Sequence, residues 1–335
     1  MKRKYGRLTE SEREEISRML AQGISIRGIA LGVRRHVSTI SREVRKGSSN
    51  RYTYRAVRSQ RRARRRAGGR RQGKRKLRLN TRLRHFVEKK LKQRWSPEQI
   101  AQALIREYPS EEAMRVSHET IYTYLYVLPR GELRQELLSC LRRKHRRRHR
   151  RRGPDHSETL RRIRNMISIE ERPAEVADRT VPGHWEGDLL IGRNRQSALG
   201  TLVERTTRFL ILVPLKNRKA SEVRKAFARE MKKFPRHAKL SLTYDQGREM
   251  AEHTLFTKDT QIRVYFAHPA SPWERGTNEN TNGLIRQFFP KGTDFSKVLR
   301  REVKHVQDLM NGRPRKVLEW RTPYEAWQKD VALKV

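Results

Sequence analysis

The sequence predicts a mixed α/β domain in the C-terminal half, preceded by an all-α and strongly basic region. Residues 1–152 carry 45 Lys and Arg against 13 Asp and Glu, a net charge of +32, whereas residues 153–335 carry 35 against 23, a net charge of +12. The first region spaces its apolar residues three and four positions apart, as in amphipathic helices, and the second alternates such segments with short apolar runs typical of strands. The chain of 335 residues has a net charge of +44, so a polyanion is the expected partner.

Composition excludes several other classes of protein. The longest apolar stretch, Phe209 to Leu215, is far shorter than the roughly 20 residues of a membrane span, and the first residues, MKRKYGRLTESEREE, lack the apolar core of a signal peptide. The single cysteine, Cys140, excludes an internal disulfide framework and a zinc site with two thiolates. We therefore expect a cytoplasmic protein that binds nucleic acid and no membrane.

Residues 1–50 are typical of a helix-turn-helix unit. Helices are predicted at Thr9–Gly23, Ser25–Val33 and Ser38–Lys46, where Ile40 and Val44 form the buried side of the third helix. Such a helix suits the major groove, where hydroxyls bond phosphates or base edges and arginine pairs with guanine. The predicted DNA contacts are Ser38, Thr39, Ser41, Arg42 and Arg45. The alternative is an ordinary three-helix bundle with a basic surface, and Arg34 occupies a turn position where glycine is easier.

A second helical unit is predicted over residues 95–140. Ser96 is placed to cap a helix whose first residue is Pro97, and Ser117 is placed to cap the next helix. Ser117, His118 and Thr120 are the predicted DNA contacts at this second start. A purely structural helical domain is the alternative.

Two basic runs connect these units. The run from Arg61 to Arg78 has 11 basic residues and no acid, and the run from Leu141 to Arg152 has nine basic residues. Since neither run has an apolar period, residues 51–94 and 141–171 are predicted to be linkers that lie along phosphates; solvated tethers are the alternative. The predicted phosphate contacts in the first run are Arg61, Arg62, Arg64, Arg65 and Arg66.

Residues 172–335 are predicted to form the α/β domain and a C-terminal helical extension. The expected strands are residues 185–191, 198–204, 208–213, 240–244 and 263–266, and the expected helices are residues 220–234 and 277–289. That order predicts three antiparallel strands followed by parallel strands with crossover helices.

Three acids within this domain are predicted to form a metal site. Asp188 lies in the middle of a largely apolar strand, where a lone carboxylate is costly unless a cation neutralises it. Asp245 directly follows a strand, and Glu279 opens the last predicted helix. Hard oxygen donors suit Mg²⁺ or Mn²⁺, and two such ions would activate a water or a 3′-hydroxyl against a phosphodiester.

Neighbouring residues compete for roles at this site. Glu186 shares a strand face with Asp188 and is an alternative outer carboxylate, whereas Glu274 is a weaker candidate for the third ligand. Trp273 and Arg275 are expected to stack on or clamp a terminal nucleotide, with core packing as the alternative for Trp273. Arg286 is expected to face a phosphate.

The sequence segments around the three acids resemble those of one protein family. RPAEVADRTVPGHWEGDLLIG from Arg172, YDQGREMAEH from Tyr244 and SPWERGTNENTNGLIRQFFPKGTDFS from Ser271 are similar to the insertion-sequence-thirty family of DDE transposases. ISIRGIA, STISREVRKG, WSPEQIA, VSHETIY and NGRPRKVLEWRTPYEA extend the resemblance over nearly the whole chain. It implies an RNase-H-like catalytic fold, with Asp188, Asp245 and Glu279 as the acidic triad.

The resemblance implies a DNA transposase that binds the terminal inverted repeats of its element and catalyses metal-dependent cleavage and strand transfer into target DNA. Since two element ends are handled together, a homo-oligomer on DNA in the bacterial nucleoid is expected. Two alternatives stay open: a non-catalytic helix-turn-helix regulator, and an RNase-H-like nuclease that cuts but does not join. The repeat sequence and the target preference are not encoded in any motif.

Overall fold

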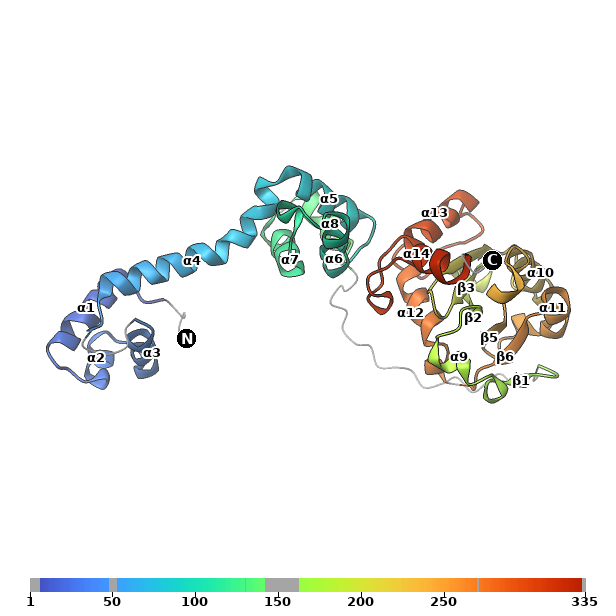
Figure 1. Ribbon diagram of the computed structural model, residues 1–335, viewed down its shortest axis with the longest axis horizontal. Helices are drawn as coiled ribbons and strands as arrows, with labels where there is room; N and C mark the ends of the chain where they lie inside the picture. The colour runs from blue at the N-terminus through green and yellow to red at the C-terminus, as the bar shows by residue number, and fades with distance from the viewer. Residues whose placement is uncertain (1–6, 48–52, 130, 142–162, 270, 333–335) are drawn as a thin grey trace. The chain divides into compact units, whose positions relative to one another are not determined.

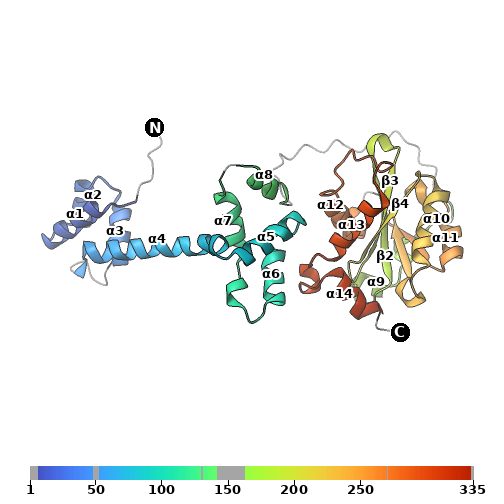
Figure 2. The ribbon, with the colours of Figure 1, turned by 90° about the horizontal axis from the view of Figure 1, so that it is seen from above.

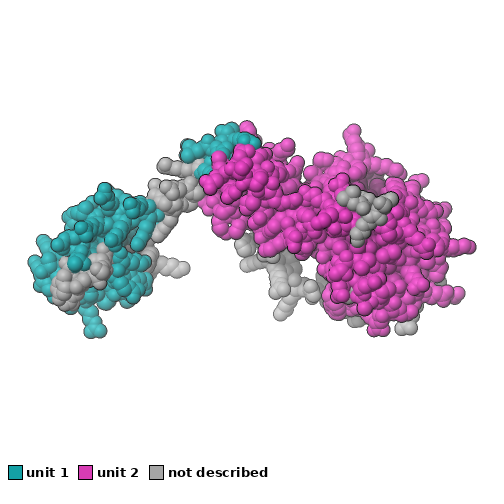
Figure 3. Space-filling view, viewed as in Figure 1, with its two compact units in different colours: residues 1–84 teal, residues 85–335 magenta. Residues whose placement is uncertain are grey.

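The computed structural model describes residues 7–47, 53–129, 131–141, 163–269 and 271–332. It contains two compact units, residues 1–84 and residues 85–335 (Figure 3). Helix α5 (Thr81–Lys92) runs through the point in the chain where the first unit ends. Among these described residues, no helix combines the length and the apolar character needed to span a membrane.

The first unit consists of three short helices and a long one (Figure 1), namely α1 (Glu10–Ala21), α2 (Ile26–Gly32), α3 (Val37–Gly47) and α4 (Ala56–Leu79). Thr9 caps α1 in a capping box with Glu12, and Ser25 caps α2. The apolar stripes meet in one core, formed by Ile16, Leu20, Ile29, Ala30, Ile40, Val44 and Tyr54. The three predicted helices are therefore present, each within two residues of its expected start and end.

The turn before α3 forms without a glycine. Arg34 adopts a left-handed backbone conformation with φ of 53°, which costs a non-glycine residue about 1–2 kcal/mol. The next residue, Arg35, donates to Glu12 of α1 at 2.7 Å, and its amide donates to the carbonyl of Ala30 at 2.9 Å. These contacts hold the turn in place, so the unusual residue at position 34 does not prevent α3 from packing.

The first basic run is a helix, and its prediction as a linker was wrong. Helix α4 spans 24 residues and includes the run from Arg61 to Arg78. The apolar-period criterion failed because arginine is a good helix former and because tertiary contacts anchor the helix at its N-terminal end. There Arg64 pairs with Glu10 at 2.8 Å, and Gln60 accepts from Arg13 at 2.8 Å. In the second basic run, residues 142–152 lie outside the described residues.

Four helices begin the second unit: the remainder of α5, then α6 (Pro97–Glu107), α7 (His118–Val127) and α8 (Glu132–Ser139). Ser96 caps α6 in a capping box with Gln99, Pro97 is its first residue, and Ser117 caps α7, as predicted. Helix α6 also contacts the C-terminal segment. Gln99 donates to the carbonyl of Pro314 at 2.7 Å, and Arg106 pairs with Glu325 at 3.2 Å.

A six-stranded mixed sheet forms the centre of the chain from residue 163 onward. Its strands are β1 (Ile167–Ser168), β2 (His184–Ile191), β3 (Ala198–Glu204), β4 (Leu210–Pro214), β5 (Ser241–Tyr244) and β6 (Arg263–Phe266). The strand order is β1-β6-β5-β2-β3-β4, with β2, β3 and β4 antiparallel and β2, β5, β6 and β1 parallel. The predicted mixed α/β fold is confirmed. Strand β1 corrects the predicted linker 141–171, because it pairs with β6 at the sheet edge.

Helices cover both faces of this sheet (Figure 2). They are α9 (Glu175–Asp178), α10 (Ala220–Met231), α11 (His253–Thr260), α12 (Gly276–Ile285), α13 (Arg300–Asn311) and α14 (Pro323–Trp327). Trp185 and Leu189 of β2 enter the core with α10 and α11, whereas Leu190 enters the core with α12 and α13. Because successive strand residues alternate between faces, Glu186 and Asp188 lie on the α12 side.

Candidate active site

Strands β2 and β5 place Asp188 and Asp245 side by side. Glu186 is paired with Thr243 in their parallel ladder, and each aspartate lies two residues further along its own strand direction. A single guanidinium contacts both carboxylates. Arg275 lies 3.0 Å from Asp245 (Nη2 to Oδ2) and 3.8 Å from Asp188 (Nη1 to Oδ1). The sheet register therefore produces a pair of neighbouring acids.

Arg275 was predicted to clamp a nucleotide, and that contact stays a prediction. The side chain lies against the acids, and its Nη1 also donates to the carbonyl of Gly187 at 3.0 Å. Two neighbouring carboxylates repel each other, and a cation between them offsets that repulsion. Arg275 supplies this positive charge.

Burial makes Asp188 an unusual carboxylate. Its pKa is raised to about 6, mainly by loss of solvent and also by the negative charges of Asp245 and Glu249, against the attraction of Arg275. Asn282 donates from Nδ2 to Oδ2 of Asp188 at 2.8 Å and orients the group. A nearby cation would strongly stabilise the charged form of such a carboxylate.

Helix α12 runs along β2, and Glu279 lies in its first turn. The amide of Asn278 donates to Oε2 of Glu186 at 2.8 Å, and Asn282 contacts Asp188 one turn later. Glu279 lies between them in sequence, four residues after Arg275 and three before Asn282, so it shares their helix face. Its side chain is exposed, and among the described residues no three His, Cys, Asp or Glu side chains are close enough to hold one metal ion. The structure thus brings together two of the three predicted acids.

The other acids near the site have different roles. Glu186 is fully buried and pairs with Arg205 at 2.9 Å, which makes it a structural ion pair. Glu274 accepts from His268 at 2.8 Å. Glu249 is half-buried, and its carboxylate folds over Gly247, where a Cβ would come within 2.6 Å of it. Burial and the charge of Asp245 raise the pKa of Glu249.

The side chains present fit a divalent cation. Asp188 and Asp245 offer carboxylate oxygens, which Mg²⁺ and Mn²⁺ prefer. The amide oxygen Oδ1 of Asn282 is buried and has no hydrogen-bond partner among the described residues. A buried amide oxygen without a partner, on a side chain that contacts Asp188, is a suitable further ligand for such a cation.

Two further residues near α12 lie differently from what the sequence indicated. Arg286 was predicted to face a phosphate, but it donates to the carbonyl of Ile191 at 3.0 Å and is half-buried, so it ties α12 to β2. Trp273 is 73% exposed, which excludes core packing for this side chain. Exposed tryptophan two residues before Arg275 is available to stack on a base.

The predicted DNA contacts of α3 fall into two groups. Ser41, Arg42 and Arg45 are exposed opposite the buried Ile40 and Val44, as expected. Ser38 and Thr39 are half-buried, and the hydroxyl of Ser38 lies 2.8 Å from Nδ1 of His36. Of these five predicted contacts, Arg42 and Arg45 are therefore the long side chains that lie exposed to solvent.

At the start of α7, capping already engages the two hydroxyls. Ser117 accepts from the amide of Thr120 at 3.2 Å, and their hydroxyl oxygens are 2.9 Å apart. His118 is exposed beside Glu119. Helix capping thus accounts for the Ser117 hydroxyl; Ser117 and His118 are both exposed, whereas Thr120 is half-buried.

Two known families match separate parts of the chain. The family described as a helix-turn-helix domain matches residues 4–47, and the family described as an integrase core domain matches residues 178–272. The second range includes both Asp188 and Asp245 and ends before Glu279.

Relatives cover almost the whole chain. The transposase for insertion sequence element IS1086 from Cupriavidus metallidurans is 42% identical over 98% of this chain and 96% of its own length. Transposase InsI for insertion sequence element IS30A from Escherichia coli is 43% identical over 99% of this chain and 86% of its own. The transposase for insertion sequence element IS4351 from Bacteroides fragilis is 35% identical over 97% and 96%. Together with the paired aspartates on the mixed sheet and the helix-turn-helix unit, this similarity shows that the chain belongs to the IS30 family of DNA transposases.

Proposed function

We propose that Asp188, Asp245 and Glu279 are the catalytic acids and that they hold two Mg²⁺ or Mn²⁺ ions. The observation that carries the proposal is the pair formed by Asp188 and Asp245, which share one guanidinium. The position of Glu279 on the helix face of Arg275 and Asn282 supports it as the third ligand. Two ions bound there would activate a water or a 3′-hydroxyl and stabilise the leaving oxygen of a phosphodiester.

The surrounding side chains prepare this site. Asn282 orients Asp188, and Arg275 keeps the two aspartates together when no other cation is present. The exposed Trp273 is placed to stack on a nucleotide of the processed strand. Cleavage that exposes a 3′-hydroxyl and its attack on a second phosphodiester then use the same acids. No Tyr or Ser nucleophile and no covalent enzyme–DNA intermediate are involved.

The first unit is proposed to recognise the terminal inverted repeats. Arg42→Ala is expected to weaken binding to the cognate repeat by about 1–3 kcal/mol, because Arg42 is exposed on α3 and arginine reads guanine by a bidentate contact. Titration of cognate and random duplexes at one salt concentration measures the loss. An equal loss on both duplexes would mean that Arg42 contacts phosphate only.

Helix α4 is proposed to bind DNA phosphates. Its helical geometry limits how many of its arginines can contact the same duplex. At about 100° per residue, Arg61, Arg62, Arg65 and Arg66 lie within an arc of roughly 140°, and Arg64 lies outside it, paired with Glu10. Replacing those four with Gln should lower the slope of log affinity against log salt by up to about 3.6, which is about 0.9 for each phosphate contact. Specific and random DNA should lose affinity alike.

The matched control for this prediction is Arg64→Gln, which removes one positive charge from the opposite side of the same helix. For this variant, the slope of log affinity against log salt should stay close to that of the unaltered chain, because Arg64 forms an ion pair with Glu10. A slope that is unchanged in the fourfold variant would make α4 a spacer without phosphate contacts. A loss confined to the cognate repeat would instead show that these arginines read sequence.

Incubation of the protein with its own element ends and Mg²⁺, followed by mapping of cut and joined products, tests the proposed reaction. Transposition predicts cuts at the element end and new strand-transfer joints. A regulator would bind without cutting, and a nuclease would cut without joining. The mass of the protein–DNA complex in the same reaction tests the proposed homo-oligomer, since two ends must be held together.

A further inference from the structure

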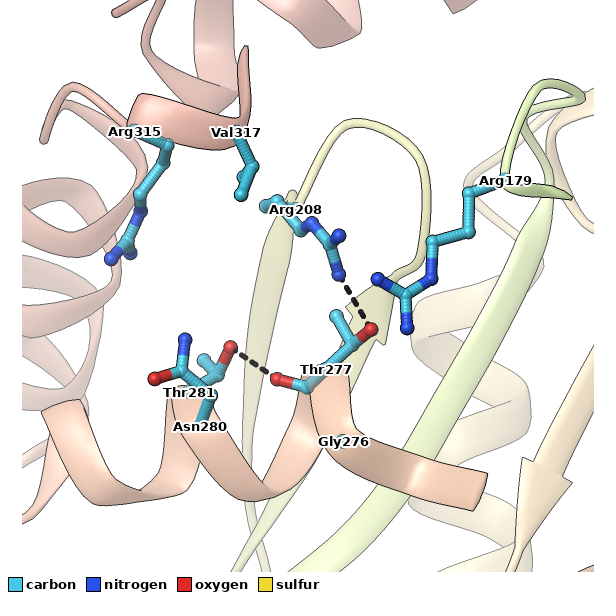
Figure 4. A pocket seen from close by; sticks show the side chains of 8 residues that line it. All are labelled: Arg179, Arg208, Gly276, Thr277, Asn280, Thr281, Arg315 and Val317. Carbon is cyan, nitrogen blue, oxygen red and sulfur yellow. Dashed lines mark hydrogen bonds between the residues drawn. The ribbon is translucent and has the colours of Figure 1, made fainter. Parts of the chain in front are cut away.

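A cavity of about 300 Å³ lies at the N-terminal part of α12. Its lining includes three arginines and three polar side chains of α12: Arg179, Arg208, Arg315, Thr277, Asn280 and Thr281. Figure 4 shows the three guanidinium groups directed into the space beside α12 from three separate segments of the chain. None of the described residues in this lining is an Asp or a Glu. We call Arg179, Arg208, Arg315 and Thr277 the arginine pocket.

Arg208 is fixed in this pocket without an acidic partner. It is half-buried between β3 and β4, and it donates to the hydroxyl of Thr277. Its Nε is buried with no hydrogen-bond partner among the described residues, and the structure gives Arg208 and Arg179 no ion pair with a described carboxylate. Burial and the nearby charge of Arg179 lower the pKa of Arg208. A buried cation beside another cation is costly unless an anion joins them.

The nearby acids are already engaged. Glu186 pairs with Arg205 and accepts from the amide of Asn278. Glu204 accepts from the amide of Gly183 and from the amide and hydroxyl of Thr207. Both acids therefore have other direct partners, although their charges also act on Arg208. An external anion fits the space between Arg208 and Arg179 as a direct partner for both.

The location of the pocket identifies the anion. Thr277 lies in the first turn of α12, a helix of 10 residues whose N-terminus adds positive potential. It follows Arg275 by two residues, and Arg275 contacts both Asp188 and Asp245. A strand whose phosphodiester reaches the aspartates therefore carries further phosphates close to this helix start.

We propose that the arginine pocket binds one phosphate of the DNA strand that enters the active site. The pocket thereby fixes the position of the strand relative to Asp188 and Asp245. Arg208 and Arg179 contact the phosphate oxygens, and Thr277 holds Arg208 in position. The choice of DNA as the source of the phosphate rests on the proposed function, whereas the anion site itself does not.

Ethylation interference on the full-length protein tests this proposal without cleavage. The probe is a duplex with the element end in which single phosphates are ethylated, and binding is measured without divalent metal. In the unaltered chain, ethylation of one phosphate near the cleavage position should weaken binding about tenfold, the effect of a charge-assisted hydrogen bond of roughly 1.5 kcal/mol. Arg208→Gln and Arg179→Gln should abolish this one effect and keep the others. Arg236→Gln, at an exposed position outside the pocket, is the matched control.

The outcomes separate the possible explanations. An interference pattern that is the same in all four proteins would overturn the proposal. Arg179 is exposed, so its variant remains informative if Arg208→Gln fails to fold. Inorganic phosphate that raises the melting temperature of the unaltered chain but not of the two variants, with no change in interference, would show a site for a free anion and reject DNA as the ligand. Because no cleavage is scored, an error in the catalytic triad would not affect the result.

Discussion

Asp188→Asn, Asp245→Asn and Glu279→Gln are each expected to lower cleavage and strand transfer by at least about 10²–10³-fold. A neutral isostere keeps the shape of the side chain but removes the charge that holds a divalent cation. Metal ions at such sites supply several kcal/mol of transition-state stabilisation, and every 1.4 kcal/mol changes the rate about tenfold. The measurement is a time course of cut and joined products on the element ends with Mg²⁺.

Specific DNA binding should be unchanged in these three variants, because the predicted reading helix α3 belongs to the other unit. Glu274→Gln is the matched control, since Glu274 lies near Glu279 in the chain but bonds His268. Cleavage near the unaltered rate in any one of the three would remove that residue from the site. If Glu279→Gln stayed active and Glu274→Gln did not, the third ligand would have to be reassigned.

Asp188→Asn is also expected to stabilise the metal-free protein at pH 7, by up to about 3 kcal/mol. Burial raises the pKa of Asp188 from 3.8 to about 6, so the folded protein holds this proton more tightly than the unfolded chain does. Stability therefore falls as the pH rises from about 4 through 6, and one pKa unit corresponds to about 1.4 kcal/mol. Asn carries no charge to bury, so the variant avoids this loss. Thermal unfolding in EDTA across this pH range measures the difference.

With Mg²⁺ present, the unaltered chain should become more stable than Asp188→Asn. A cation that binds only the folded state stabilises it by mass action, so the unaltered chain should gain melting temperature with increasing Mg²⁺ while Asp188→Asn gains little. Asn282→Leu provides a second comparison, because it removes the orphaned amide oxygen and keeps both aspartates. Equal stabilisation of the unaltered chain and Asp188→Asn by Mg²⁺ would place the ion elsewhere.

Local patterns were sufficient for most of the secondary structure. The caps Thr9, Ser25, Ser96 and Ser117 begin helices where the sequence places them, because a cap bonds an amide only three residues away. Strands β3 and β6 have the predicted limits, since each contains consecutive apolar or β-branched residues that favour a strand. The helix α4 was missed because an arginine-rich segment has no apolar period, and its packing on α1 depends on residues outside it.

The mixed α/β class, the helix-turn-helix unit, the basic charge that favours a polyanion and the candidate acids all follow from the amino-acid sequence. The contacts that those residues make depend on tertiary packing. Arg275 and Arg286, both predicted to contact DNA, contact the acids and a strand carbonyl in the structure. An arginine is long and always charged, so its role depends on which acceptor lies within about 3 Å of it. The register between β2 and β5 and the path of α12 decide which acceptor each arginine reaches. Both features arise from packing between segments that are far apart in the chain.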